Sequence, residues 1–367
     1  MTHTNRYAFF VTPHGFGHAG RASAVMSAIL ARQPDAFFEI FTRVPDWFFH
    51  MSLNHAAAGA SPYRYHDVLT DVGLVQATSM IEDLPATIDR LGELLPYRAD
   101  ALDALAAVLT DTGCRAVLCD IAPLGIAAAH RAGLPALLVE NFTWDWIYRG
   151  YLDEEPRFAP YIDYLHAAFT AADHHIRALP ACTDDPPAGL TVQPVSRKPR
   201  AARAETRARL GVPPDAPLVM ITMGGILTLY PFLDQIQNHP SMRFLIPGGS
   251  AEHEQRGSLV LIPHHSDFYH PDLVEAADVI IGKLGYSTLA EARAAGLPYI
   301  YIPRPNFPET EPMSRYARED MGAVELSEER FLSGDWLDLL PELLARPRTR
   351  PETPNGADQI AEYLAVL

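Results

Sequence analysis

The chain has 367 residues, 48% of them apolar, and a formal net charge of −16. This length favours two domains that each bury a core. The acidic balance argues against a general nucleic-acid binder or a protein of acidic membrane surfaces. The longest apolar runs fall short of the ~20 residues of a membrane helix, and the N-terminus lacks the basic flank of a signal peptide. Three cysteines without metal-type spacing fit a reducing compartment, so we expect a cytoplasmic protein.

The N-terminal part of the chain reads as a βαβ unit. Residues 7–12 form an apolar strand, 21–31 have the spacing of a helix, and 37–42 form a second strand. Residues 51–80 read as irregular. This order predicts the start of an α/β domain with a doubly wound parallel sheet.

The next elements continue the same alternation. We expect helical structure over 81–109 with a break near Pro96, a strand over 116–119 that ends in Asp120, and a helix over 124–132. A strand over 136–140 then leads into an aromatic-rich loop over 141–151.

A proline- and charge-rich connection with one short helix indicates a domain boundary. We predict an N-terminal Rossmann-like domain over 1–195, a linker over 196–217, a C-terminal Rossmann-like domain over 218–350, and a closing helix within 351–367. Strands over 218–223, 244–246 and 259–262 restart a parallel sheet, and the first of them ends in Gly224-Gly225.

Residues 279–312 form the most informative stretch of the second domain. We expect a strand over 279–281, a turn between Gly282 and Gly285, a helix that ends at Gly296, a strand over 299–302 and then an acidic loop. Such a turn directs free backbone N–H groups and the positive end of a helix at one point, which is where phosphate binds.

Polar side chains at this turn strengthen the phosphate interpretation. Lys283, one of two lysines in the chain, adds a charge, and Ser287 and Thr288 stand where a helix N-cap is expected. Glu291, one turn into the helix, could accept hydrogen bonds from a ribose diol. The alternative is an ordinary βα unit whose glycines serve only the turn.

A second glycine turn, His14-Gly15-Phe16-Gly17-His18, directly follows the first strand. Ligands of open parallel sheets bind at the carboxyl ends of strands, where Asp120 also lies. We predict that His18 is a general base supported by Asp120, and that His14 shapes the pocket or contacts the ligand. The alternative is a structural role for either histidine.

The aromatic loop 141–151 also follows a strand end. Trp144, Trp146, Tyr148 and Tyr151, with Asp145 between them, could stack on a sugar or another flat acceptor. The alternative is that these aromatic side chains pack in the core or in a lid.

Three pieces of sequence together resemble the two-domain nucleotide-sugar glycosyltransferases of the GT-B fold. They are V-T-P-H-G-F-G-H-A, then C-D-I-A-P with N-F-T-W-D-W-I-Y, then I-G-K-L-G-Y-S-T-L-A-E-A with P-N-F-P-E-T-E-P. The chain is similar to UDP-glycosyltransferases, to peptidoglycan N-acetylglucosaminyltransferases and, most closely, to the glycosyltransferase-like N-terminal region of plant L-arabinokinases.

The resemblance implies two Rossmann-like domains that face each other across a cleft, with the acceptor on the first and the nucleotide sugar on the second. His18 and Asp120 match the catalytic pair, and Glu309 and Glu311 match residues that hold donor-sugar hydroxyls. The expected nucleotide-sugar contacts are Gly15, Gly17, Gly224, Gly225, Lys283, Gly285, Ser287, Thr288 and Glu291, and the expected acceptor contacts are Trp144, Asp145 and Trp146. The family's donor turn usually carries a histidine near the position of Lys283.

The residues and the resemblance together predict a metal-independent, inverting transfer of a sugar from a nucleotide diphosphate sugar, and the resemblance implies UDP as the nucleotide. The expected partners are this donor and a small-molecule or glycan acceptor, with no cofactor, no metal and no nucleic acid. Two alternatives stay open. One is a hydrolase or epimerase of nucleotide sugars on the same fold, and the other is a non-catalytic nucleotide-sugar-binding protein.

Overall fold

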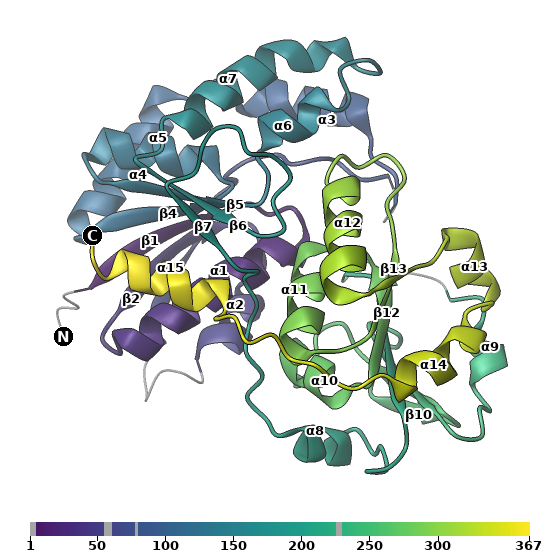
Figure 1. Cartoon of the computed structure of the whole chain (residues 1–367). Helices are drawn as coiled ribbons and strands as arrows, with labels where there is room; N and C mark the ends of the chain where they lie inside the picture. The colour runs from purple at the N-terminus through teal and green to yellow at the C-terminus, as the bar shows by residue number, and fades with distance from the viewer. Residues whose placement is uncertain (1–4, 55–60, 78–79, 225–229) are drawn as a thin grey trace. The chain divides into compact units, whose positions relative to one another are not determined.

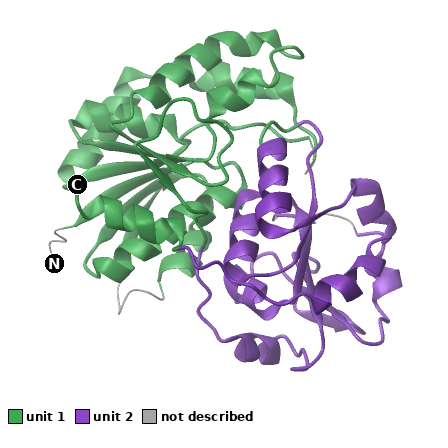
Figure 2. Ribbon diagram, viewed as in Figure 1, with its two compact units in different colours: residues 1–196, 307–309, 354–367 green, residues 197–306, 310–353 purple. Residues whose placement is uncertain are grey.

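The computed structural model describes residues 5–54, 61–77, 80–224 and 230–367. Its internal packing divides the chain into two compact units (Figure 2). Unit 1 contains Met1–Ser196, Phe307–Glu309 and Pro354–Leu367, and unit 2 contains Arg197–Asn306 and Thr310–Thr353. No helix among the described residues is long and apolar enough to cross a membrane.

Unit 1 is built on a parallel sheet with the strand order β3-β2-β1-β4-β5-β6-β7. The strands are β1 (Arg6–Val11), β2 (Phe37–Thr42), β3 (Tyr63–Asp67), β4 (Ala116–Asp120), β5 (Ala136–Glu140), β6 (His174–Ala178) and β7 (Leu190–Val192). The strand order reverses between β1 and β4, which is the topological switch point where doubly wound sheets bind ligands.

Helices cover both faces of this sheet. Helices α1 (Gly15–Arg32), α2 (Asp46–Leu53) and α15 (Gly356–Leu364) lie on one face (Figure 1). The other face carries α3 (Leu84–Leu94), α4 (Ala99–Asp111), α5 (Pro123–Ala132), α6 (Trp144–Arg149) and α7 (Ala159–Thr170).

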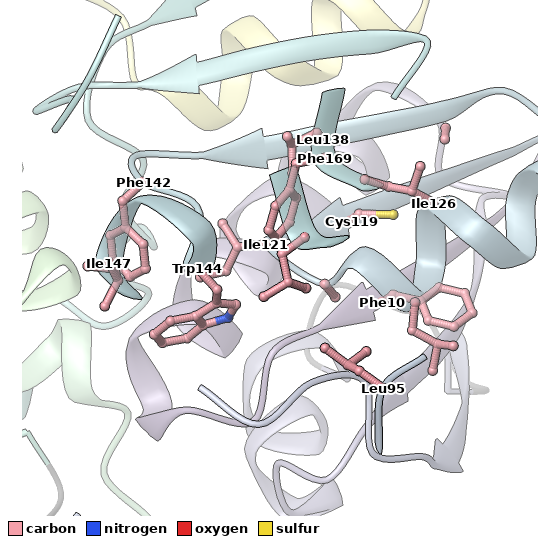
Figure 3. Packing of buried hydrophobic residues seen from close by; sticks show 14 of the residues in the cluster. Phe10, Leu95, Cys119, Ile121, Ile126, Leu138, Phe142, Trp144, Ile147 and Phe169 are labelled. Carbon is pink, nitrogen blue, oxygen red and sulfur yellow. The ribbon is translucent and has the colours of Figure 1, made fainter. Parts of the chain in front are cut away.

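The core beneath the second helical layer reaches from the sheet to the aromatic segment after β5. Phe10, Cys119 and Leu138 point from the strands towards Ile126 of α5 and Phe169 of α7, and Trp144 lies in the same cluster beside Phe142 (Figure 3). Close packing demands Gly125, because a methyl group there would lie 2.6 Å from Phe10 Cβ.

The C-terminal helix belongs to unit 1 and packs on α1. Its start is fixed by Asn355, whose Nδ2 donates to the carbonyl and the hydroxyl of Ser196 at 2.8 and 2.9 Å. Gly356 is required there because a methyl group would lie 1.9 Å from Gln193 O. The last residues of the chain are therefore part of the first domain.

Unit 2 contains a second sheet with the order β10-β11-β9-β8-β12-β13-β14, parallel except for β10. Its strands are β8 (Leu218–Thr222), β9 (Arg243–Pro247), β10 (Glu254–Arg256), β11 (Leu259–Ile262), β12 (Val279–Lys283), β13 (Tyr299–Ile302) and β14 (Val324–Glu325). The strand order reverses between β8 and β12. Its helices are α8 (Arg203–Arg209), α9 (Leu233–Ile236), α10 (His270–Ala276), α11 (Tyr286–Ala295), α12 (Thr310–Met321), α13 (Glu328–Ser333) and α14 (Leu340–Ala345).

The predicted α/β class with two Rossmann-like parallel-sheet domains is confirmed, as are the break near Pro96 and the strand that ends in Asp120. Five local predictions were wrong. Strand β12 continues through Gly282 to Lys283, where a turn was expected. The first helix begins at Gly15 and not at Arg21, and β3 lies in the stretch predicted as irregular. The aromatic loop contains α6, and the acidic loop already turns into α12 at Thr310.

Candidate functional site

The switch point of unit 1 places two polar side chains together. His18 lies in the first turn of α1, the helix that follows β1, and Asp120 ends β4, whose last residue pairs with Val11 of β1. His18 Nδ1 lies 2.9 Å from Asp120 Oδ1, and both side chains are buried. The structure therefore brings the predicted base and its predicted carboxylate into a hydrogen bond.

Arg21, one helical turn after His18, binds the same carboxylate with two parallel bonds. Its Nε donates to Asp120 Oδ2 and its Nη2 to Asp120 Oδ1, both at 2.7 Å. Burial disfavours ionisation of Asp120, but Arg21 and His18 outweigh it and hold the pKa of this carboxyl below its ordinary value. Asp120 is therefore an anion at neutral pH.

The charge of Asp120 favours one proton position on His18. Arg21 Nη2 at 3.2 Å from Nδ1 would need this nitrogen to accept, but the shorter 2.9 Å contact with Asp120 favours the proton of the neutral ring on Nδ1, because an ionised carboxylate can only accept. Nε2 is then the nitrogen with a free lone pair, as a general base requires.

Strain in the backbone accompanies this arrangement. Ile121, the residue after Asp120, has a φ of +41°, a conformation that β-branched residues rarely adopt. Such strain costs of the order of 1–3 kcal/mol and persists where the surrounding structure enforces it. Ile121 is fully buried, so packing holds the end of β4 in this conformation.

His14 has a different environment from His18. The backbone N–H of Leu74 donates to His14 Nδ1 at 3.4 Å, and the ring lies edge-on to Trp144 with 5.1 Å between centroids. Because Nδ1 accepts this bond, His14 holds the loop after β3. Gly15 starts α1 with a φ of +70°, whereas Gly17 lies within the first turn of the helix.

A second buried carboxyl, Asp71, lies beside the pair. Asp71 Oδ1 accepts from Thr12 Oγ1 at 2.6 Å, and its Oδ2 lies 3.2 Å from Thr70 Oγ1, which also reaches Val11 O at 3.0 Å. The pKa of Asp71 is raised to about 7, mainly by burial and also by the negative charge of Asp120. The hydrogen bonds from Thr12 and Thr70 lower this pKa but do not offset the increase. Asp71 is thus a group that titrates near neutral pH next to Asp120.

The three predicted acceptor residues are the first three residues of α6. Trp144 is fully buried in the core cluster, and Asp145 is buried with His166 Nδ1 at 3.0 Å from its Oδ2. Trp146 is partly buried against the same cluster. The packing role weighed for these aromatic side chains therefore describes Trp144, Tyr148 and Tyr151, which are all buried.

Asn141 directly follows β5 and lies between Arg21 and Glu309. Its Oδ1 accepts from Arg21 Nη1 at 2.6 Å, and its Nδ2 donates to Glu309 Oε1 at 2.8 Å. Glu309 belongs to unit 1 together with Phe307 and Pro308. Glu309, which was predicted to bind the donor sugar, is therefore connected to Asp120 through the side chains of Asn141 and Arg21.

The switch point of unit 2 is made of glycines and one lysine. Gly224 follows β8 with a φ of +70°, and a methyl group there would lie 3.8 Å from Lys283 Nζ at the end of β12. Gly282 lets the two strands pair closely, because a methyl group there would lie 2.1 Å from Thr222 O. Gly225 lies outside the described residues.

The start of α11 differs in detail from the prediction. Its N-cap is Gly285, with no side-chain capping bond, so Ser287 and Thr288 lie in the first turn and are not the N-cap. A glycine N-cap adds no side chain at the start of the helix, and the positive end of a helix attracts anions. Ser287 is partly exposed, and Thr288 is buried.

Glu291 is buried and binds two cationic or ionisable side chains of unit 2. Arg197 Nε donates to its Oε1 at 2.9 Å, and His270 Nδ1 lies 2.7 Å from its Oε2. Burial opposes the charge, but Arg197 and His270 lower the pKa of Glu291 overall. Glu311 lies on the exposed first turn of α12.

The sequence interpretation missed three residues that the structure brings to the first switch point. Arg21 could have been found from its position three residues after His18 on one helix face. Asn141 directly follows a strand, as Asp120 ends one. Asp71 lies in the stretch 51–80, which has no recognisable pattern. In unit 2, His264 near Gly248 is a further missed candidate at a strand end.

Comparisons with known proteins show which proteins this chain resembles in sequence and in fold. The family models searched include none that matches the chain. The chain is 29% identical over 373 residues to L-arabinokinase of Arabidopsis thaliana, covering 98% of this chain and 34% of that protein. It is 29% identical over 216 residues to a UDP-N-acetylglucosamine–N-acetylmuramyl-(pentapeptide) pyrophosphoryl-undecaprenol N-acetylglucosamine transferase of Desulforudis audaxviator, covering 49% of this chain and 55% of that protein.

Among solved structures, MurG of Acinetobacter baumannii aligns with 99% of this chain and 100% of its own, with a TM-score of 0.56 and 16% identity. The chain has the GT-B fold. The chain therefore spans about a third and about half of the two curated relatives, and its GT-B fold extends over nearly all of its length.

Proposed function

We propose that the protein is a glycosyltransferase that moves a sugar from a nucleotide diphosphate sugar to an acceptor hydroxyl with inversion. The observation that carries the proposal is the buried His18–Asp120 hydrogen bond of 2.9 Å at the switch point of a GT-B chain. A carboxylate-supported imidazole with a free Nε2 is the arrangement that removes a proton from a hydroxyl.

In the proposed reaction, His18 Nε2 takes the proton of the acceptor hydroxyl. The acceptor oxygen attacks the anomeric carbon, a new glycosidic bond forms, and the bond between that carbon and the phosphate oxygen breaks. The nucleoside diphosphate leaves with the electron pair, and attack from the opposite side inverts the anomeric centre. The negative charge of Asp120 stabilises the imidazolium that forms on His18.

Unit 2 would bind the donor. We propose that Lys283, the hydroxyls of Ser287 and Thr288, and the N-terminal end of α11 hold the diphosphate without a metal ion and stabilise the leaving group. Gly224, Gly225 and Gly285 would allow the close approach of backbone to phosphate. UDP is the proposed nucleotide, because the Desulforudis audaxviator relative is a UDP-N-acetylglucosamine transferase by name.

We propose three further contacts, with the ribose, with the donor sugar and with the acceptor. Glu291 would bind the ribose while Arg197 and His270 hold its carboxylate. Glu309 and Glu311 would bind sugar hydroxyls. Trp146, the partly buried residue of the three aromatic-loop candidates, would contact the acceptor directly.

The test combines ligand binding with product analysis. Nucleotides and nucleotide sugars are screened by thermal shift, and a ligand at 100 times its Kd should add ~2.7 kcal/mol of stability. Lys283→Ala should weaken the shift, and Lys198→Ala, which removes the same charge elsewhere in unit 2, should not. No shift with any of the ligands in wild type would contradict the donor site.

Transfer is then measured with the donor so identified. His18→Ala should abolish product formation, and His130→Ala, a substitution of an exposed histidine in α5, should not. Free sugar released without an acceptor would indicate the hydrolase alternative. Binding that persists with no turnover in wild type would favour the non-catalytic alternative.

A further inference from the structure

A continuous chain of hydrogen bonds runs from the His18–Asp120 pair to Glu309. Asp120 accepts two bonds from Arg21, Arg21 Nη1 donates to Asn141 Oδ1 at 2.6 Å, and Asn141 Nδ2 donates to Glu309 Oε1 at 2.8 Å. Arg21 and Asn141 are almost completely buried, with exposed fractions of 1% and 0%. Buried polar chains of this kind depend on every member keeping its position.

Donor and acceptor chemistry allows one orientation of Asn141. A guanidinium only donates and a carboxylate only accepts, so the amide must turn its oxygen to Arg21 and its nitrogen to Glu309. The other orientation would place Oδ1 against Glu309 and the amide hydrogens against Arg21. Arg21 and Glu309 therefore require the same orientation of Asn141, and Glu309 holds the amide in it.

The position of Arg21 matters to His18 because its Nη2 also lies 3.2 Å from His18 Nδ1. Two arrangements compete. In one, the guanidinium binds Asp120 and Asn141, and His18 Nδ1–H donates to Asp120. In the other, the guanidinium donates to the Nδ1 lone pair, and the ring proton moves to Nε2, which then cannot accept a proton from a substrate. The distances from Asp120 to Arg21 Nη2 and to His18 Nδ1, 2.7 and 2.9 Å, are shorter than the 3.2 Å between Nη2 and Nδ1, so the observed position of the guanidinium favours the first arrangement. The bond from Arg21 Nη1 to Asn141 holds the guanidinium in this position.

Packing fixes Glu309 in its place. Phe307 is buried, with its ring edge-on to Phe142 at 6.2 Å, and Pro308 lies so close to Gly150 that a methyl group there would be 2.5 Å from Pro308 Cγ. These two contacts hold both neighbours on the N-terminal side of Glu309. The carboxylate is thus presented to Asn141 by a packed segment.

From this geometry we infer that Asn141 and Glu309 are positioning residues that, through Arg21, keep the proton of His18 on Nδ1. The inference rests on the proposed function in one respect, the use of His18 Nε2 as the base. It adds to the expected role of Glu309, because a residue predicted to bind donor sugar also sets the state of the catalytic pair.

The test measures the tautomer of His18 and the kinetics of transfer in separate experiments. Long-range ¹⁵N–¹H spectra of histidine-labelled protein report which ring nitrogen of His18 carries the proton. In wild type the signal should be that of the Nδ1–H form. Asn141→Ala and Glu309→Ala should shift the population towards Nε2–H, and Glu309→Gln, which keeps an acceptor oxygen for Asn141, should shift it least. Glu319→Ala removes an exposed carboxylate of α12 and should leave the tautomer unchanged.

Kinetics distinguish positioning from donor binding. Asn141→Ala should lower kcat by roughly 10- to 100-fold with the donor KM within about twofold of wild type, since a residue that only binds donor would raise KM instead. A folded Asn141→Ala protein with an unchanged His18 tautomer would overturn the inference. If Asn141→Ala does not fold, an unchanged tautomer in Glu309→Ala would overturn it. A tautomer shift in a protein without transfer activity would contradict the proposed function alone.

Discussion

Each of the two sheets has one switch point where its strand order reverses, and the residues at the two switch points differ in chemistry. Between β1 and β4, unit 1 places a buried ion pair, Asp120 with Arg21, beside His18. Between β8 and β12, unit 2 places glycines and Lys283. A carboxylate whose charge is balanced by an arginine suits a site that moves a proton. Glycine backbone with one lysine suits a site that binds a negatively charged ligand.

The largest expected effect comes from breaking the charge balance of unit 1. Asp120→Asn leaves Arg21 buried without its anion, which should lower the free energy of unfolding by about 3–5 kcal/mol. The amide cannot fix His18 in the Nδ1–H form, so activity should fall by roughly three to four orders of magnitude. Chemical denaturation and kcat/KM measure the two effects.

A double replacement provides the control for Asp120→Asn. Arg21→Met with Asp120→Leu removes both charges, so much of the stability should return while activity does not. Recovery of activity in the double variant would contradict the role given to the charged pair.

The close strand pairing of unit 2 should give the next effect. Gly282→Ala places a methyl group 2.1 Å from Thr222 O, a backbone atom that cannot move without separating β8 from β12. We expect a loss of about 3 kcal/mol in unfolding free energy. The matched control is Gly285→Ala, where the nearest atom would be 3.9 Å away, and equal losses in the two variants would show that close approach is not the reason for Gly282.

Asp71 should make the stability of unit 1 depend on pH near neutrality. Its folded pKa of about 7 lies above the ordinary value of 3.8, so between these values the folded chain holds a proton that the unfolded chain has released. The free energy of unfolding therefore falls as pH rises through this window, by about 2 kcal/mol between about pH 5.5 and pH 8.

Asp71→Asn should remove that pH dependence. The protonated carboxyl can donate from Oδ2 to Thr70 Oγ1, which in turn donates to Val11 O, and an asparagine reproduces this pattern. Thermal denaturation across this pH range should show the variant gaining stability over wild type as pH rises. A constant difference at all pH values would mean that Asp71 is already ionised at the acid end.

The smallest expected effect tests a single hydroxyl at the second switch point. Ser287→Ala should weaken the Kd of a bound nucleoside diphosphate about fivefold, or by about 1 kcal/mol, because one neutral hydrogen bond is lost. Ser333→Ala, an exposed serine at the end of α13, serves as the control in the same titration calorimetry. An unchanged Kd for Ser287→Ala would restrict the proposed anion contact to Lys283 and the backbone.

The sequence allowed prediction of features that depend on one element at a time. Apolar runs followed by glycine or aspartate located the ends of β1, β4 and β8 to within one residue, and a parallel sheet gathers such strand ends at one edge. The end of β12 was placed too early, because Gly282 was taken for a turn residue and lies in the strand. Arg21 was not predicted, since a buried arginine in a helix looks like a surface residue until its anion is known. Its partner is 99 residues away in sequence.

Other parts of the site depend on packing that sequence patterns do not encode. Trp144 is a core residue because α6 turns its ring towards the sheet, whereas a loop could have exposed it. The bond between Asn141 and Glu309 joins residues 168 positions apart. The left-handed conformation of Ile121 contradicts the local preference of its residue type and could be found only in the folded chain.

The docking of α15 on α1 has a consequence for biosynthesis. The helix that carries His18 has its outer partner supplied by residues that leave the ribosome after all of unit 2. Unit 1 therefore cannot complete its fold while the rest of the chain is being made, although domains commonly fold in the order of synthesis. The helix that carries His18 gains this support only once residues 354–367 have been made, so a chain interrupted before Pro354 would carry both sheets and still leave one side of α1 uncovered.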